Sequence, residues 1–192
     1  VNVAAKIAES SIATAAAVHL ACAVPNVDWG VSLTHFYLAE DIVLERAMAW
    51  LAARNQALPV AQRLLPAALL LKAVAVALQR YPGFNGFWRD AGFVAGNGIH
   101  LGVAISLRDG GLVAPALHDA AAMDIAALTR ALLDLVKRTR AGALRSSELS
   151  DPTITVTNLG DQGVASVFGV ITPPQVALVG FGRIALRPWA DE

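Results

Sequence analysis

The chain has 192 residues, enough for one domain with a substantial core, and 56% of them are hydrophobic while only 16% are charged. A composition this apolar predicts a large buried interface between subunits. The fifteen basic and fifteen acidic residues balance, so nothing favours nucleic acid as a partner. The single cysteine, Cys22, excludes an internal disulfide and a multi-cysteine metal site.

The sequence gives no sign of export or of a membrane. Residues 1–10 lack the basic start, apolar core and cleavage site of a signal peptide. The most apolar segment, Pro66–Leu78, is interrupted by Lys72 and is too short to cross a bilayer. We therefore expect a cytoplasmic location, without membrane contact. Because the sequence begins with Val1, we also expect a fragment or a processed product.

A helical segment is predicted over residues 1–33. Residues 11–24 are rich in alanine and Pro25 ends the predicted helix. His19 lies within it and is interpreted as a core or interface histidine, because no partner stands three or four residues on. The run from Glu9 to Ala16, followed by His19-Leu20 and Trp29-Gly30, resembles the end of the barrel domain of enolase-superfamily enzymes. The chain is too short for that barrel, so we expect a splice or fusion without enolase-type activity.

Three further helices are predicted. Leu44–Asn55 has an apolar and a charged face, which is typical of an amphipathic helix. Ala67–Arg80 follows Pro66, which suits a first helical turn, and its nearly uniform apolar character predicts burial on all sides. Asp124 is positioned to cap a helix over Ile125–Arg140.

Strand signals alternate with these helices. The segment Tyr81–Trp88 ends the helix before it and leads into a strand. Arg89–Gly92 is predicted to be a turn, after which the chain returns at Phe93-Val94. Ile99–Leu107 alternates as a second strand, and the turn Arg108–Gly111 joins it to Leu112–Leu117. His100 and His118 fall at the strand ends. Either could line a site, but strand-end or surface roles are favoured.

The stretch 153–184 carries the strongest functional signal. Thr153–Thr157 alternates threonine with β-branched residues, as a strand with one polar face does, and Asn158-Leu159-Gly160 stops it. Glycines keep the next loop open, and Pro173-Pro174 precedes Gln175–Gly182, which predicts a buried strand. The Thr157 hydroxyl and the Asn158 amide thus stand where the chain leaves a sheet. They suit a binding site, or they only cap the strand end.

Two motifs in this stretch carry a resemblance. Thr-x-Thr-Asn-Leu-Gly, from Thr155 to Gly160, and Pro-Pro-Gln-Val-Ala-Leu-Val-Gly-x-Gly, from Pro173 to Gly182, resemble the catalytic domain of dihydrolipoyl acyltransferases of 2-oxo acid dehydrogenase complexes. The resemblance runs from about His35 to Trp189. It implies a domain over residues 34–192 with the α/β fold of chloramphenicol acetyltransferase, a two-layer sandwich with a mixed sheet. It also implies that Thr157 holds the oxyanion of a tetrahedral intermediate, and we take Thr157 and Asn158 as the candidate catalytic residues.

The resemblance further implies what the domain works with. Family members move an acyl group between coenzyme A and a dihydrolipoyl group carried on a separate domain, without a metal, at sites between the subunits of a trimer. The implied partners are a homotrimer or higher assembly, a lipoyl domain and the other components of the dehydrogenase complex. Lys137, Arg138 and Arg140 could attract the phosphates of coenzyme A, although pairing with the dipole of their own helix is favoured.

One departure leaves the activity open. The family's His-x-x-x-Asp-Gly motif is absent from the 192 residues, and none of the four histidines begins it. We therefore expect a C-terminally truncated domain that has little activity by itself. The alternative is a non-catalytic, trimer-forming scaffold or a truncated remnant of the domain.

Overall fold

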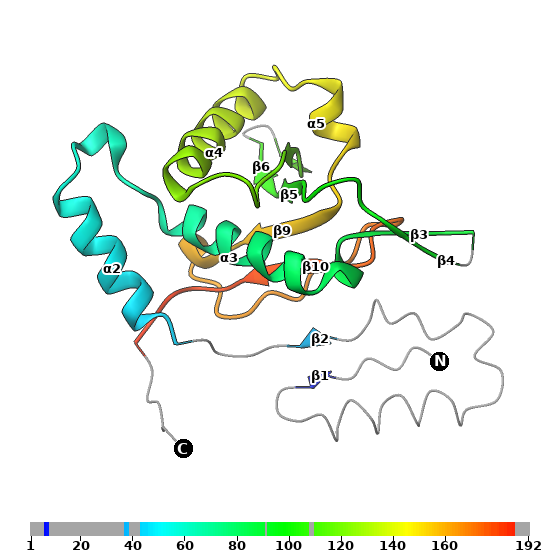
Figure 1. Cartoon of the computed structure of the whole chain (residues 1–192), viewed down its shortest axis with the longest axis horizontal. Helices are drawn as coiled ribbons and strands as arrows, with labels where there is room; N and C mark the ends of the chain where they lie inside the picture. Colours follow the sequence, from blue (N-terminus) through cyan, green and yellow to red (C-terminus); the bar gives the residue numbers. More distant parts are fainter. Residues whose placement is uncertain (1–5, 8–36, 39–42, 91, 108–109, 187–192) are drawn as a thin grey trace. The chain divides into compact units, whose positions relative to one another are not determined.

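The computed structural model describes residues 6–7, 37–38, 43–90, 92–107 and 110–186 (Figure 1). The chain divides into two units, Val1–Val43 and Leu44–Glu192. In the first unit, β1 (Lys6–Ile7) pairs in parallel with β2 (Tyr37–Leu38). The predicted helix over residues 11–24, His19 and the enolase-like segment lie outside the described residues. The predicted boundary at residue 34 stays a prediction.

The helices of the second unit begin and end close to the predicted positions. They are α2 (Glu45–Gln56), α3 (Pro66–Arg80), α4 (Ile125–Arg140) and the short α5 (Ser146–Ser150), with 3₁₀ turns η2 (Val60–Gln62), η3 (Pro82–Phe84) and η4 (Gly160–Gln162). Asp124 caps α4 as predicted, because its Oδ1 accepts the N–H of Ala127 at 2.6 Å. Gly142, at φ +67°, follows the end of α4.

A four-stranded mixed sheet forms the centre of the second unit, in the order β10-β9-β5-β8. Its strands are β5 (Leu101–Val103), β8 (Ala116–Leu117), β9 (Ile154–Asn158) and β10 (Leu178–Phe181). β9 runs parallel to both of its neighbours, whereas β5 and β8 are antiparallel. The predicted mixed sheet of an α/β fold is therefore confirmed.

Two antiparallel hairpins leave this sheet. One joins β3 (Gly86–Arg89) to β4 (Gly92–Ala95), and the other joins β6 (Ile105–Ser106) to β7 (Leu112–Val113). The predicted strand Ile99–Leu107 is broken at Ala104, whose N–H completes the β5–β9 pairing by donating to Val156 O at 2.9 Å. Opposite the break stands Pro115, which has no N–H to donate to a ladder.

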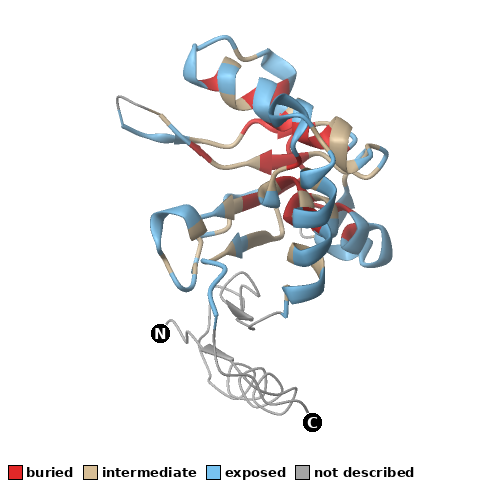
Figure 2. Ribbon diagram, turned by 90° about the vertical axis from the view of Figure 1, so that its left-hand side faces the viewer, coloured by how far each residue is buried: buried red, intermediate tan, exposed pale blue. Residues whose placement is uncertain are grey.

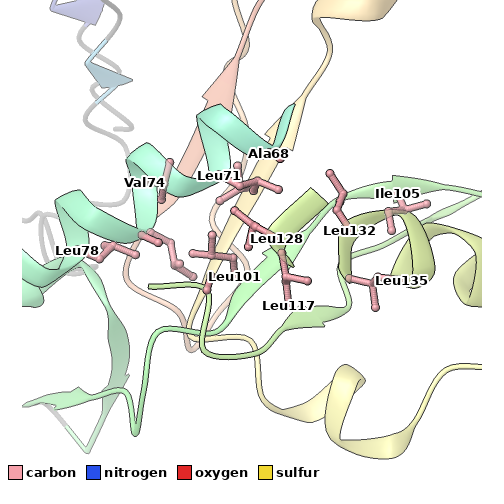
Figure 3. Close-up of a cluster of buried hydrophobic side chains, with 14 residues drawn as sticks. Ala68, Leu71, Val74, Leu78, Leu101, Ile105, Leu117, Leu128, Leu132 and Leu135 are labelled. Carbon is pink, nitrogen blue, oxygen red and sulfur yellow. The ribbon is translucent and has the colours of Figure 1, made fainter. Parts of the chain in front are cut away.

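Helices α3 and α4 pack on one face of the sheet, and their inner side chains form the core (Figure 3). Leu71 and Leu78 of α3 and Leu128 of α4 meet Leu101 and Ile154 of the sheet. Buried residues gather on the strands and on the inner faces of the helices, with the outer helix faces exposed (Figure 2). This arrangement gives the two layers expected from the resemblance.

Two expectations about burial are wrong. The outer face of α3 is open, since Ala73, Val76 and Ala77 are exposed, because α3 is covered by the sheet and α4 on one side only. β10 is only partly buried because it is an edge strand. By length and composition alone, the 21 residues Val60–Arg80 meet the criteria for a membrane span, so the expectation of no membrane contact stays a prediction. However, α3 contributes six buried residues to the second unit, and a core helix passes the same test.

Candidate active site at the end of β9

The central strand β9 separates an apolar face from a polar one. Ile154 and Val156 are buried in the core beneath the helices. Because side chains alternate along a strand, Thr153, Thr155 and Thr157 face the other side of the sheet. The sequence pattern Thr-Ile-Thr-Val-Thr thus becomes a row of three hydroxyls on one face.

The first two hydroxyls of this row are engaged in buried hydrogen bonds. Thr153 Oγ1 donates to Asn85 Oδ1 at 2.6 Å, and Thr155 Oγ1 donates to Gln175 Oε1 at 2.7 Å. The amide groups of these partners are anchored in turn, Asn85 Nδ2 to Gly98 O and Gln175 Nε2 to Pro152 O. Asn85 and Gln175 therefore cover the threonine face of β9 along its first part.

The third hydroxyl is available. Thr157 is half-buried at the end of β9, and its hydroxyl makes no hydrogen bond within the part of the chain that the structure describes. A hydroxyl that is held by a strand and lacks a protein partner can donate to a ligand at little cost. Of the two predicted catalytic residues, Thr157 has the freedom that this role requires.

Asn158 is engaged in the turn that ends the strand. Its Oδ1 accepts the N–H of Gly160 at 2.9 Å, which is the local bond of an Asx turn. The interpretation as a strand-end cap therefore fits this oxygen. The residue also lines a small cavity of about 50 Å³, together with Val103, Val156 and Phe181. Asn158 is thus beside Thr157 in the chain but faces the helical side of the sheet.

The segment after the turn folds back against β10 and bounds the site. Gly180 is the register partner of Thr157, and a Cβ on Gly180 would meet Val167 Cβ at 2.8 Å. A Cβ on Gly182 would collide with the backbone of Ala165. Register partners in a parallel pair face the same side, so Val167 lies on the Thr157 side of the sheet. The motif's glycines are therefore needed for a close approach of two chain segments.

The two described histidines lie at the opposite end of the sheet. His100 O accepts the N–H of Thr153 at 2.9 Å, at the start of β9, and His118 Nε2 stands 3.0 Å from Asp151 Oδ2. Thr157 is four residues further along β9, about 13 Å at the rise of a strand. Neither histidine can reach a group bound at Thr157, so their predicted strand-end roles fit the structure. His19 and His35 lie outside the described residues.

The basic end of α4 is used inside the protein. Arg138 donates to Glu148 Oε2 at 2.6 Å and to Asp134 Oδ2 at 2.7 Å. These bonds raise the pKa of Arg138 above its usual value. Arg138 is therefore already neutralised by two carboxylates, which favours the structural interpretation of this cluster. Among the described residues, no group of three or more His, Cys, Asp or Glu side chains is arranged to hold a metal ion.

Two residues that shape the site were not singled out from the sequence. Asn85 and Gln175 bond to the Thr153 and Thr155 hydroxyls and so decide which threonine stays free, yet the sequence analysis gave neither of them a role. The available signal was a polar amide inside an apolar run, since such a group needs partners when it is buried.

A hydroxyl donor at the carboxyl end of a central strand, in a mixed α/β sandwich, defines a domain suited to stabilising an oxyanion. The sequence profile of the 2-oxoacid dehydrogenases acyltransferase (catalytic domain) matches residues 29–192. The chain belongs to this family.

Relatives agree with this assignment. The dihydrolipoyllysine-residue acetyltransferase component of the pyruvate dehydrogenase complex of Mycobacterium tuberculosis is 38% identical over 119 residues, covering 61% of this chain and 21% of that protein. The corresponding protein of Rhizobium meliloti is 31% identical over 165 residues, covering 81% of this chain and 37% of that protein. The chain thus spans between a fifth and two fifths of the length of these relatives.

Solved structures show the same fold. A probable dihydrolipoamide acetyltransferase from Listeria monocytogenes is 26% identical with a TM-score of 0.67, covering 74% of this chain and 63% of that one. The dihydrolipoamide acetyltransferase of Azotobacter vinelandii is 23% identical with a TM-score of 0.71, covering 76% of this chain and 61% of that one. The predicted fold class is therefore confirmed.

Proposed function

We propose that this domain transfers an acyl group between coenzyme A and a dihydrolipoyl group, with Thr157 as the oxyanion donor. The observation that supports this is the free hydroxyl of Thr157, on a strand whose other two threonines are hydrogen-bonded. The catalytic mechanism of the Azotobacter vinelandii acetyltransferase was investigated through a serine, a histidine and an asparagine. A threonine can supply the same kind of hydroxyl as a serine.

The chemistry assigns one step to Thr157. The sulfur of the accepting thiol attacks the thioester carbonyl, and the carbon–oxygen double bond becomes an oxyanion on a tetrahedral carbon. The Thr157 hydroxyl donates a hydrogen bond to that oxyanion, which then collapses and expels the other thiol. Such a donor lowers the barrier because it is held in place before the charge develops.

A second group must take the proton of the attacking thiol. A thiol with a pKa of about 8.5 is mostly protonated at neutral pH, so a positioned base is required. His100 and His118 are too far from Thr157, as their position at the start of β5 and the end of β8 indicates. The base is therefore proposed to come from outside the described residues or from another polypeptide that carries the His-x-x-x-Asp-Gly motif.

The proposed setting is a multi-subunit assembly. One structure with the same fold, at 23% identity and a TM-score of 0.71, is the cubic core of the pyruvate dehydrogenase multienzyme complex. We propose that this chain also forms a homotrimer or a higher assembly, and that its lipoyl substrate is carried on a separate domain of a dehydrogenase complex. Coenzyme A is the second substrate, no metal takes part, and the proposed location is cytoplasmic.

The test is acetyl transfer from acetyl-CoA to dihydrolipoamide. The folded chain is assayed alone and with a fused or separate segment that carries His-x-x-x-Asp-Gly. We expect transfer with the added segment, and we expect Thr157→Ala to abolish most of it. A folded, oligomeric chain that transfers nothing under either condition would contradict the proposal and favour the non-catalytic scaffold.

A further inference from the structure

The chain places an asparagine directly before a glycine at two points, Asn85-Gly86 and Asn97-Gly98. The side-chain carbonyl carbon of an asparagine can be attacked by the backbone nitrogen of the next residue. Glycine hinders that attack least because it has no Cβ, and asparagine is accordingly one of the thermolabile residues of proteins. Both dipeptides have the same local chemistry, so a difference between them in the folded protein comes from their surroundings.

The first dipeptide is held by the fold. Asn85 is 7% exposed, its Oδ1 accepts the hydroxyl of Thr153 at 2.6 Å, and its Nδ2 donates to Gly98 O at 2.8 Å. Gly86 is buried at the start of β3, where it is the register partner of Ala95. Attack on Asn85 would break both of these side-chain hydrogen bonds inside the protein. We therefore expect Asn85 to stay intact as long as the chain is folded.

The second dipeptide is open. Asn97 is exposed in the bend between β4 and β5. Within the part of the chain that the structure describes, its side chain makes no hydrogen bond and the N–H of Gly98 donates to no acceptor. The reacting carbon and the attacking nitrogen can therefore approach each other without first breaking a hydrogen bond of the protein.

Position 98 requires the glycine that makes this dipeptide reactive. Gly98 has a φ of +127°, a conformation that residues with a side chain rarely adopt. A Cβ at this position would meet His100 Cε1 at 2.6 Å and Asp119 Oδ1 at 3.4 Å. The His100 ring is itself fixed, because its Nδ1 accepts the N–H of Asp119 at 3.1 Å. The fold thus keeps a glycine behind an exposed asparagine.

We propose that Asn97 is a self-modification site, which converts to aspartate and isoaspartate in the folded protein while Asn85 stays intact. The Gly98 nitrogen loses its proton and bonds to Asn97 Cγ, the bond from Cγ to Nδ2 breaks, and ammonia leaves. Water then opens the cyclic imide. Cleavage between the Gly98 nitrogen and Cγ gives aspartate, and cleavage between that nitrogen and the Asn97 main-chain carbonyl carbon gives isoaspartate. Neither step uses an oxidant or a cofactor.

The isoaspartate product changes the surroundings of Asn85. It lengthens the main chain by a carbon just before Gly98, whose carbonyl accepts Asn85 Nδ2. This segment has little room, since the His100 ring lies where a Cβ on Gly98 would be. Asn85 in turn holds the buried Thr153 at the start of β9. A displaced Gly98 carbonyl leaves a buried amide without its acceptor, so the modified protein should be less stable.

Incubation of the full chain in water labelled with heavy oxygen tests the site. Trypsin cleaves after Arg89 and so separates Asn85 from Asn97, and mass spectrometry then measures the label that each conversion leaves in its peptide. We expect Asn97 to convert at least about tenfold faster than Asn85 in the folded protein, because Asn85 reacts only after local opening. In urea the two rates should be similar.

Asn97→Gln is the matched control, because it keeps an amide at the exposed position but would have to close a larger ring. It should take up no label at position 97 and should unfold in urea as fresh wild-type protein does. Aged wild-type protein should unfold at a lower urea concentration than fresh protein, and aged Asn97→Gln should not.

The outcomes separate the site from its consequence. No conversion at Asn97, equal conversion at Asn85 and Asn97 in the folded protein, or a difference that persists in urea would each overturn the proposal. Aged wild-type protein that has converted at Asn97 and still unfolds like fresh protein would overturn the loss of the Asn85 contact.

Discussion

The Thr155 hydroxyl donates to Gln175 Oε1 at 2.7 Å, and this bond joins the two motifs by which the family is recognised. Gln175 also donates from its amide nitrogen to Pro152 O at 3.0 Å, so it clamps the Pro-Pro-Gln segment to the start of β9. The bond occupies the middle hydroxyl of the strand. It leaves Thr157, two residues further on, as the hydroxyl that a substrate can use.

Thr157→Ala should lower acyl transfer by about a hundred- to a thousandfold, the usual loss when one oxyanion donor is removed. It should change the free energy of unfolding little, because the Thr157 hydroxyl makes no hydrogen bond within the described structure. Thr157→Ser should keep most of the rate. The measurements are kcat/KM for acetyl transfer and urea unfolding of the same samples. A loss of stability that parallels the loss of rate would contradict the catalytic role.

Thr155→Val and Gln175→Leu should each destabilise the protein by about 1–3 kcal/mol, because each leaves a buried polar partner unsatisfied. The double variant should cost less than the sum of the two, since neither partner is then left alone. Urea unfolding of the four proteins gives the coupling energy. Strictly additive effects would mean that the bond contributes little.

The local elements could be predicted because their signals are local. Pro66 and Asp124 mark the first turns of α3 and α4, and the alternation of residues 153–157 marks β9. The break at Ala104 could not be predicted, because it depends on which strands pair on its two sides: β5 pairs with β8 and β9, whereas β6 pairs with β7. The exposure of the outer face of α3 likewise depends on which elements pack against it.

The candidate site was only partly predictable for the same reason. The motif pointed to Thr157, and the alternation of the strand gave the face on which it lies. Which threonine stays free depends on Asn85, which is 68 residues from Thr153 in the sequence. A pattern within one strand carries no information about such a partner, so the site emerged from the tertiary contacts.

Gly182→Ala should destabilise the protein and Gly83→Ala should not. A Cβ at position 182 would collide with the Ala165 backbone, whereas nothing lies within 4 Å of a Cβ at position 83. Backbone atoms cannot rotate away as a flexible side chain can, so the segment over β10 must shift. We expect the melting temperature to fall for Gly182→Ala only. Equal melting temperatures would show that this segment adapts freely.

His100→Gln and His118→Gln should leave the rate of acyl transfer unchanged. Both histidines are at the end of the sheet opposite Thr157, and His118 is paired with Asp151 at 3.0 Å. His118→Gln should cost some stability because this pair is lost. The measurement is kcat together with its pH dependence for both variants and the wild-type protein. A large fall in kcat at unchanged stability would instead identify the substituted histidine as the base.

The Arg138–Glu148 pair should make stability depend on pH in acid. The Glu148 side chain is only 6% exposed, and its Oε2 accepts hydrogen bonds from Arg138 and from the Arg145 N–H. The hydrogen bond from Arg138 holds the pKa of Glu148 below its usual value, although burial opposes this shift. A lowered pKa in the folded state means that the carboxylate stabilises the fold above the unfolded-state pKa and that this contribution is lost as the pH falls through the folded-state pKa.

Glu148→Gln should therefore destabilise the protein most near neutral pH, by about 1–3 kcal/mol, because it removes hydrogen bonds to a buried charged group. The difference in the free energy of unfolding between this variant and the wild-type protein should become smaller once the pH falls below 4.5, the ordinary pKa of the glutamate side chain. Urea unfolding across this pH range measures it. Glu45→Gln, at an exposed position in the first turn of α2, is the matched control and should show a small difference at every pH. If the difference in the free energy of unfolding between Glu148→Gln and the wild-type protein stays the same at every pH tested, the ion pair does not contribute to folding.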